Sequence, residues 1–164
     1  MKRTIAIIGS FKQHNLQIQR LCASLRASGV TVTSPQGVGV IQEGVEFVRF
    51  HTDNPGWSDP AVQSLAVHRI LRAELVYVVL PNGYIGKTTC YEVGRVIQAG
   101  LPIYFSHQPL DLPLHVPTNF IFDETTLLAN LTDPKWNPDW LFVNDSDHAS
   151  ELERELIAGT PRND

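Results

Sequence analysis

Short apolar runs and helix-like repeats alternate along the first hundred residues of the chain. The apolar runs, which are typical of strands buried on both faces, occupy 4–8 (TIAII), 30–33 (VTVT), 75–80 (LVYVVL) and 102–105 (PIYF). Between about 15 and 28, apolar residues recur at the spacing of one helix face, and further helices are predicted over 59–72 and 88–99. This alternation favours an α/β domain with a parallel sheet.

The remaining segments have weaker patterns. Residues 36–60 are rich in turn-forming residues, and we predict a long insertion or lid there, with a possible edge strand over 45–50. After residue 106 prolines interrupt the chain, with a possible strand over 119–122 and a possible helix after 123. A final acidic helix is predicted over 148–157. Its thin apolar stripe would consist of Ala149, Leu152 and Leu156.

No repeat, low-complexity tract or internal linker divides the sequence. We therefore predict a single domain over residues 1–164, with the core βα units in 1–106 and a Pro-rich extension and C-terminal helix in 107–164. The central sheet is expected to be mainly parallel and to have about five strands.

Composition and charge exclude several classes of protein. The chain has 164 residues and a net charge of −4, so we expect one domain with a core and no basic surface for duplex nucleic acid. No run approaches the roughly 20 apolar residues of a membrane span, and no signal-peptide pattern opens the sequence. Two cysteines, Cys22 and Cys90, suit a reducing compartment. We therefore expect a cytoplasmic protein that does not bind membranes.

The histidines do not have the spacing of a metal site, such as H-x-x-x-H, so neither a metal ion nor another cofactor is expected. Ser10 is followed by no nucleophile-elbow motif, which argues against a serine hydrolase.

Two loops are candidates for a binding site. Ligands of open parallel sheets bind beyond the carboxyl ends of the strands, where helix N-termini attract oxyanions. The first candidate loop consists of Gly9, Ser10, Phe11 and Lys12, and the second spans 81–87. The alternative for Gly9 and Ser10 is an ordinary short turn.

The second loop also resembles a phosphate-binding Walker A loop. Residues 81–88 (PNGYIGKT) match G-x-x-x-x-G-K-[ST] except that Pro81 replaces the first glycine. Proline cannot adopt the backbone angles of that glycine, because its ring fixes φ near −65°. The residues therefore argue against a P-loop hydrolase.

Glu92 is the strongest candidate for chemistry. It lies on the flank of the predicted helix 88–99, about one turn from its start, where a carboxylate is aimed across the mouth of the sheet. Two structural alternatives remain. Glu92 could form a capping box with Thr89, or it could pair with Arg95 at i, i+3.

These segments resemble a known family. Residues 83–86 (GYIG), 90–95 (CYEVGR) and 98–104 (QAGLPIY) resemble the nucleoside 2-deoxyribosyltransferase-like superfamily, whose signature is a glycine-containing loop, E-[ILV]-G-x-A and a G-[KL]-P-[IV] turn. The resemblance covers about residues 2–105. It implies a flavodoxin-like or Rossmann-like three-layer α/β fold, and it implies cleavage or transfer at the N-glycosidic bond of a nucleoside or nucleotide.

The resemblance also implies roles for single residues. Glu92 matches the family nucleophile, which attacks the anomeric carbon of the sugar through an oxocarbenium-like transition state. The two loops would bind the sugar, phosphate or base through Gly9, Ser10, Phe11, Asn82, Gly83, Tyr84 and Gly86. Members of the family are commonly homo-oligomers, so we expect one here.

Three departures from the family pattern keep a second hypothesis open. Gly86 stands where transferases of the family carry an aspartate, Glu74 stands where an aspartate is usual, and Val96 replaces the alanine of the motif. The alternative is therefore a non-catalytic nucleotide-binding or sensor protein of the same fold. A third possibility is cleavage of a larger N-ribosyl substrate such as NAD.

Overall fold

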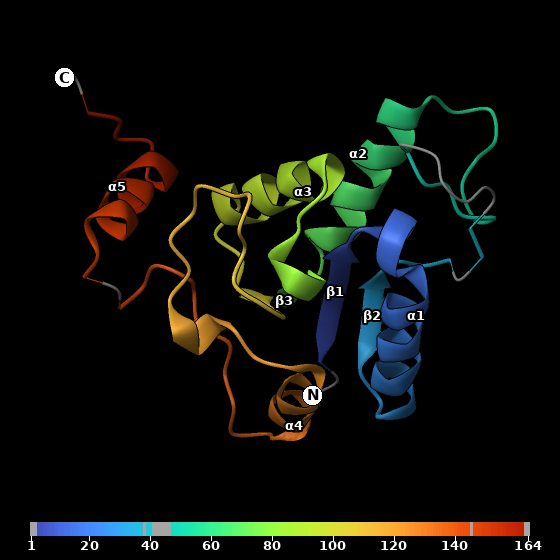
Figure 1. The fold of residues 1–164 in the computed structure, drawn as a ribbon, viewed down its shortest axis with the longest axis horizontal. Helices are drawn as coiled ribbons and strands as arrows, with labels where there is room; N and C mark the ends of the chain where they lie inside the picture. The colour runs from blue at the N-terminus through green and yellow to red at the C-terminus, as the bar shows by residue number, and fades with distance from the viewer. Residues whose placement is uncertain (1–2, 38, 41–46, 145, 163–164) are drawn as a thin grey trace.

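The chain folds around a sheet of four parallel strands with helices on both faces (Figure 1). The structure is a computed structural model that describes residues 3–37, 39–40, 47–144 and 146–162. The strands, in the spatial order β2-β1-β3-β4, are β1 (Thr4–Gly9), β2 (Thr31–Ser34), β3 (Leu75–Val79) and β4 (Ile103–Phe105). The predicted α/β three-layer fold is confirmed, and the order 2-1-3-4 is that of flavodoxin-like sheets.

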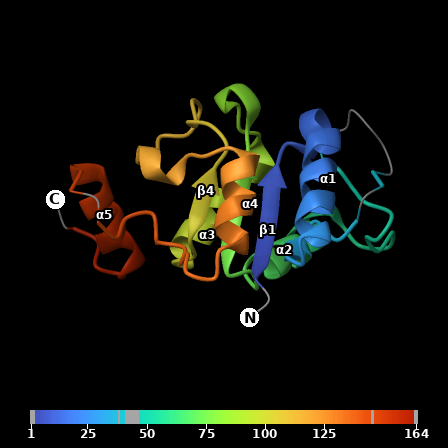
Figure 2. The same ribbon diagram turned by 90° about the horizontal axis from the view of Figure 1, so that it is seen from below.

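The described part of the chain contains five α-helices. They are α1 (Phe11–Ala27), α2 (Asp59–Ile70), α3 (Lys87–Gln98), α4 (Glu124–Thr132) and α5 (His148–Ile157). The helices α1 and α4 cover one face and α2 and α3 the other (Figure 2). Gln17 of α1 donates to Glu124 of α4 at 2.9 Å, which ties the two helices on the first face together.

The two central strands place the candidate loops next to each other. β1 and β3 pair in parallel from Ile5 opposite Leu75 to Gly9 opposite Val79. Every residue of β3 is buried, as is β1 after its first residue, because helices cover both faces of the sheet. The loops that follow Gly9 and Val79 therefore start side by side at the carboxyl edge.

The expected fifth strand does not form, so the sheet has four strands rather than about five. The segment predicted over 119–122 begins with the 3-10 turn η2 (Thr118–Phe120), and a single bridge then joins Ile121 to Phe105. The side chain of Asp123 accepts a hydrogen bond from the Thr126 N–H at 2.8 Å and so caps α4. The chain enters this helix before a strand can extend.

The possible edge strand at 45–50 lies partly outside the described residues. Within residues 47–50 the structure shows one antiparallel bridge, between Phe50 and Val40, and no strand.

The C-terminal helix α5 spans the predicted residues, but its apolar stripe does not face the core. Ala149, Leu152 and Leu156 are exposed, and the buried residue of the helix is Ser150. The extension instead packs on the core through Leu141 and Phe142, which precede the helix. In both views α5 lies at the end of the molecule away from β1 and β2 (Figures 1 and 2).

Within the described segments, none of the helices combines the length and the apolar character that crossing a membrane requires. Cys22 is buried and Cys90 is half-buried, and both are free thiols.

Candidate active site

A cavity of about 460 Å³ opens at the carboxyl edge of the sheet, where the strand order changes direction between β1 and β3. The cavity is lined by residues 7–13, which form the end of β1 and the start of α1, by residues 34–37 at the end of β2, and by residues 86–89 at the start of α3. One face of α2 and part of the insertion complete the wall. This volume lies in the range of small-molecule sites.

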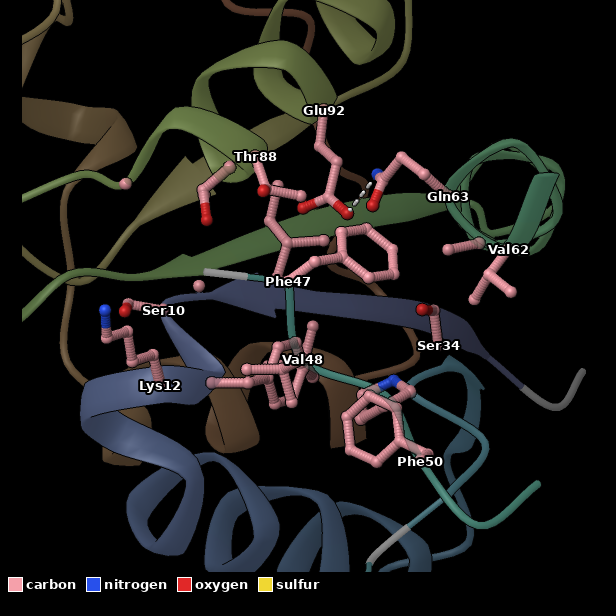
Figure 3. A pocket seen from close by; sticks show the side chains of 18 of the residues that line it. Ser10, Lys12, Ser34, Phe47, Val48, Phe50, Val62, Gln63, Thr88 and Glu92 are labelled. Atoms are coloured by element: carbon pink, nitrogen blue, oxygen red, sulfur yellow. Dashed lines mark hydrogen bonds between the residues drawn. The ribbon is translucent and has the colours of Figure 1, made fainter. Parts of the chain in front are cut away.

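The side chain of Glu92 points into this cavity from α3, between Thr88 and Gln63 (Figure 3). Glu92 is only 8% exposed. The N-cap of α3 is Gly86, so Glu92 lies too far along the helix for a capping box. The guanidinium of Arg95 lies over the ring of Tyr91, 6.0 Å from its centroid, rather than against Glu92. Both structural alternatives for Glu92 are therefore wrong.

Burial controls the ionisation of Glu92. Loss of solvent raises the pKa of its carboxyl from 4.5 to about 7, because the charged form is poorly stabilised inside the protein. The amide Nε2 of Gln63 donates to Glu92 Oε1 at 2.9 Å, and this hydrogen bond lowers the pKa. Glu92 is thus poised to change charge near neutral pH, as groups at functional sites often do.

One end of the cavity is suited to an anion. Ser10 and Gly86 are the N-caps of α1 and α3, and neither N-cap side chain accepts a hydrogen bond from the first turn of its helix. Neither first turn contains an acidic residue. Lys12 lies beside Ser10 at this end (Figure 3). The positive ends of two helix dipoles therefore favour a bound oxyanion at this end of the cavity.

The described part of the insertion forms an aromatic wall of the cavity. Phe47 and Phe50 line the cavity, and the ring of Phe50 meets that of Phe11 edge-on, with 5.1 Å between centroids. The carboxylate of Asp53 accepts the Phe50 N–H at 2.7 Å and lies 4.0 Å from Nη1 of Arg69 on α2. These contacts attach the aromatic wall to α2.

The structure brings most of the predicted site residues together. The cavity lining includes Gly9, Ser10, Phe11, Tyr84, Gly86 and Glu92. The side chain of Tyr84 is 43% exposed, and adding a Cβ to Gly86 would meet nothing within 4 Å. The structure therefore places residues from both loops in the lining of the cavity that Glu92 enters.

Asn82 and Gly83 lie outside the cavity lining, contrary to expectation. They belong to the 3-10 turn η1 (Pro81–Gly83), where both have positive φ, 59° and 76°. A Cβ on Gly83 would lie 2.5 Å from the carbonyl oxygen of Gln108. This turn is therefore shaped by its contact with the segment after β4.

We expect Gly83→Ala to destabilise the protein by about 2–4 kcal/mol, because it combines left-handed backbone strain with a backbone clash. Gly94→Ala is the matched control, since it lies within α3 and its added Cβ meets nothing within 4 Å. That change should stabilise the protein by about 0.5–1 kcal/mol. Denaturant unfolding measures both, and equal effects at the two positions would refute the packing role of Gly83.

Glu74 lies at the opposite edge of the sheet from the cavity. Its carboxylate accepts the backbone N–H of Thr4 at 2.7 Å, and its own N–H donates to the Thr4 hydroxyl at 3.0 Å. Glu74 therefore holds the start of β1, and it does not line the cavity.

The cavity also contains residues that no motif indicated. Four residues of α2 line it: Val62, Gln63, Ala66 and Arg69. Their spacing shows that they share one face of the helix, but not that this face meets a cavity. Phe47, Phe50 and Asp53 come from the insertion, whose pattern predicted turns and a possible edge strand over 45–50 but did not indicate these residues as part of a site.

The chain matches no protein-family model and no curated protein sequence. Among the described residues, no three His, Cys, Asp or Glu side chains gather in a metal-binding arrangement. A functional interpretation therefore depends on the geometry of the cavity: a buried carboxylate, an anion-attracting end and an aromatic wall.

Proposed function

We propose that the cavity binds a nucleoside or nucleotide and that Glu92 cleaves or transfers its N-glycosidic bond. The observation that carries this proposal is the buried carboxylate of Glu92 in the wall of a cavity of small-molecule size, in hydrogen-bond contact with Gln63. A carboxylate in such a site can stabilise or capture the positive charge that develops on the sugar when its bond to the base breaks.

The reaction would proceed in two steps. One oxygen of ionised Glu92 attacks the anomeric carbon, the bond to the base nitrogen breaks, and its electron pair leaves with the base, which takes up a proton. A water molecule then attacks the same carbon and gives up one proton to the solvent, while the glycosyl ester bond breaks and its electron pair returns to the carboxylate. A second base in place of water would make the reaction a transfer.

The two ends of the cavity give the substrate an orientation. Ser10, Lys12 and the helix N-termini favour the 5′ end of the sugar, above all when it carries a phosphate. The aromatic residues Phe47 and Phe50 favour the flat face of the base.

A substrate panel tests this proposal. The purified protein is incubated with ribonucleosides, deoxynucleosides, their 5′-monophosphates and NAD, and the free base is measured by chromatography. We expect release from at least one class of substrate, and no release by Glu92→Gln. Equal release by both proteins would show that Glu92 is not the nucleophile.

Gly86 favours a second candidate function, a non-catalytic nucleotide sensor. Gly86 lines the cavity at the position where transferases of the resembled superfamily carry an aspartate, and it supplies no proton donor for a leaving base. Binding of a nucleotide by both wild type and Glu92→Gln, without release of base by either, would support the sensor.

A further inference from the structure

Gln63 is the polar side chain that reaches Glu92 from the opposite wall of the cavity. It projects from α2 toward α3, and its Nε2 donates to Glu92 Oε1 at 2.9 Å (Figure 3). The second oxygen of the carboxylate lies on the side of Thr88. The two helices that cover this face of the sheet are thus joined through the candidate nucleophile.

We propose that Gln63 is the positioning residue of this site, which holds one oxygen of Glu92 so that the other is presented to the anomeric carbon. This proposal rests on the proposed function. A glutamate carboxylate rotates freely about its last bond, so a fixed donor on one oxygen selects the orientation from which the second oxygen can attack.

The helix that carries Gln63 is itself well anchored. Val62 and Val67, which precede and follow Gln63 within α2, are both buried. At the start of α2, the carboxylate of Asp59 accepts a hydrogen bond from Nε of Arg49 at 2.8 Å. The donor is therefore carried by a rigid element, as positioning of a reactive group requires.

A neutral amide suits this position better than a cation. A lysine or arginine in contact with Glu92 would neutralise the charge that stabilises the developing oxocarbenium ion. Among the residues that the structure describes, the charged side chains that line the cavity besides Glu92 are Lys12 of α1, Asp53 of the insertion, Arg69 of α2 and Lys87 of α3, and the carboxylate of Asp53 lies against Arg69. The pKa of Glu92 responds to burial and to the Gln63 amide.

The amide contact persists through the proposed chemistry. When the free oxygen of Glu92 bonds to the anomeric carbon, the oxygen held by Gln63 becomes the ester carbonyl and still accepts the hydrogen bond. When water breaks the ester, the electron pair returns to a carboxylate that is already in its reactive orientation. Gln63 touches neither reacting atom and acts through Glu92.

The experiment compares Gln63→Met, which removes the donor at similar size, with Gln63→Glu and with the control Gln98→Met. Gln98 is exposed at the end of α3, so the control makes the same change away from the cavity. The readout is the pH dependence of kcat/KM for the best substrate of the panel. In Gln63→Met we expect a rate about tenfold lower at pH 7 and an acid limb displaced by roughly one pH unit to higher pH.

Gln63→Glu is expected to lose nearly all activity at pH 7, because two adjacent carboxylates would share one proton. Gln98→Met should keep the wild-type kcat/KM at pH 7 and the wild-type midpoint, which is the pH at which the acid limb of the profile reaches half its height. If Gln63→Met keeps the wild-type rate and midpoint, or loses rate equally at every pH, the positioning role is overturned.

A second measurement separates this proposal from the proposed function. The midpoint of Glu92 can also be read from the pH dependence of unfolding, by comparing each Gln63 variant with and without Glu92→Gln. If no substrate is cleaved, the proposed function fails, and this midpoint still reports whether Gln63 controls the carboxylate. An unmoved midpoint in Gln63→Met overturns the Gln63 proposal whatever the activity.

Discussion

Replacing Glu92 by glutamine is expected to reduce base release on the order of a thousandfold or more, the size of effect seen when a group that stabilises transition-state charge is removed. The amide has nearly the same shape as the carboxylate, so it fits the same space beside Gln63. It carries no negative charge for the sugar cation and cannot form the glycosyl ester. The loss should therefore fall on kcat, with ligand affinity changed little.

Kinetics of base release and calorimetric binding of the substrate measure the two quantities separately. Glu124→Gln makes the same chemical change on α4, on the opposite face of the sheet, and should leave both unchanged. A variant at position 92 that loses binding in the same proportion as turnover would show that Glu92 holds the ligand rather than attacking it.

The same substitution is expected to stabilise the protein at alkaline pH. The pKa of Glu92 is raised from 4.5 to about 7 on folding, chiefly by burial, so the folded state holds its proton more tightly than the unfolded chain. Stability from this group is fully present below pH 4.5 and is lost as the pH rises through about 7. The loss corresponds to about 3 kcal/mol, and a neutral glutamine avoids it.

Urea unfolding of the two proteins from pH 4 to pH 9 measures this effect. We expect the free energies of unfolding of Glu92→Gln and wild type to be most similar at acid pH. Above pH 8 we expect the variant to be more stable by about 3 kcal/mol. A difference that does not vary with pH would mean that Glu92 is not buried as a titrating carboxyl. The stability sacrificed at this position would be the consequence of keeping a reactive carboxylate out of water.

Local periodicity was sufficient to predict the four strands of the sheet and the position of Glu92 on its helix, whereas the role of Glu92 as a nucleophile comes from the resemblance and stays a prediction. Strands buried on both faces and amphipathic helices leave strong patterns, and the angle of Glu92 on its helix placed it at the sheet edge before any tertiary contact was known. The prediction of a fifth strand was wrong because the capping of α4 by Asp123 competes with extension of the sheet at Ile121.

The rest of the site depends on contacts between distant segments. Arg49 donates to the Trp57 carbonyl at 2.7 Å as well as to Asp59, and this pairing places the aromatic wall against α2. No periodicity in a turn-rich insertion encodes such a contact. A glycine near the end of a strand does not by itself indicate whether its loop binds a ligand or packs against the protein. Gly9 lines the cavity, whereas Gly83 packs against Gln108.

The short bridge beyond β4 has a consequence for self-association. An uncovered outer strand offers unpaired backbone groups on which a foreign strand can add, and such addition leads to aggregation. Here the Phe122 N–H donates to the Phe105 carbonyl at 3.1 Å, and Ile121 bridges the same residue. Because β4 has only three residues, this contact occupies much of the edge to which a strand from another molecule could hydrogen-bond.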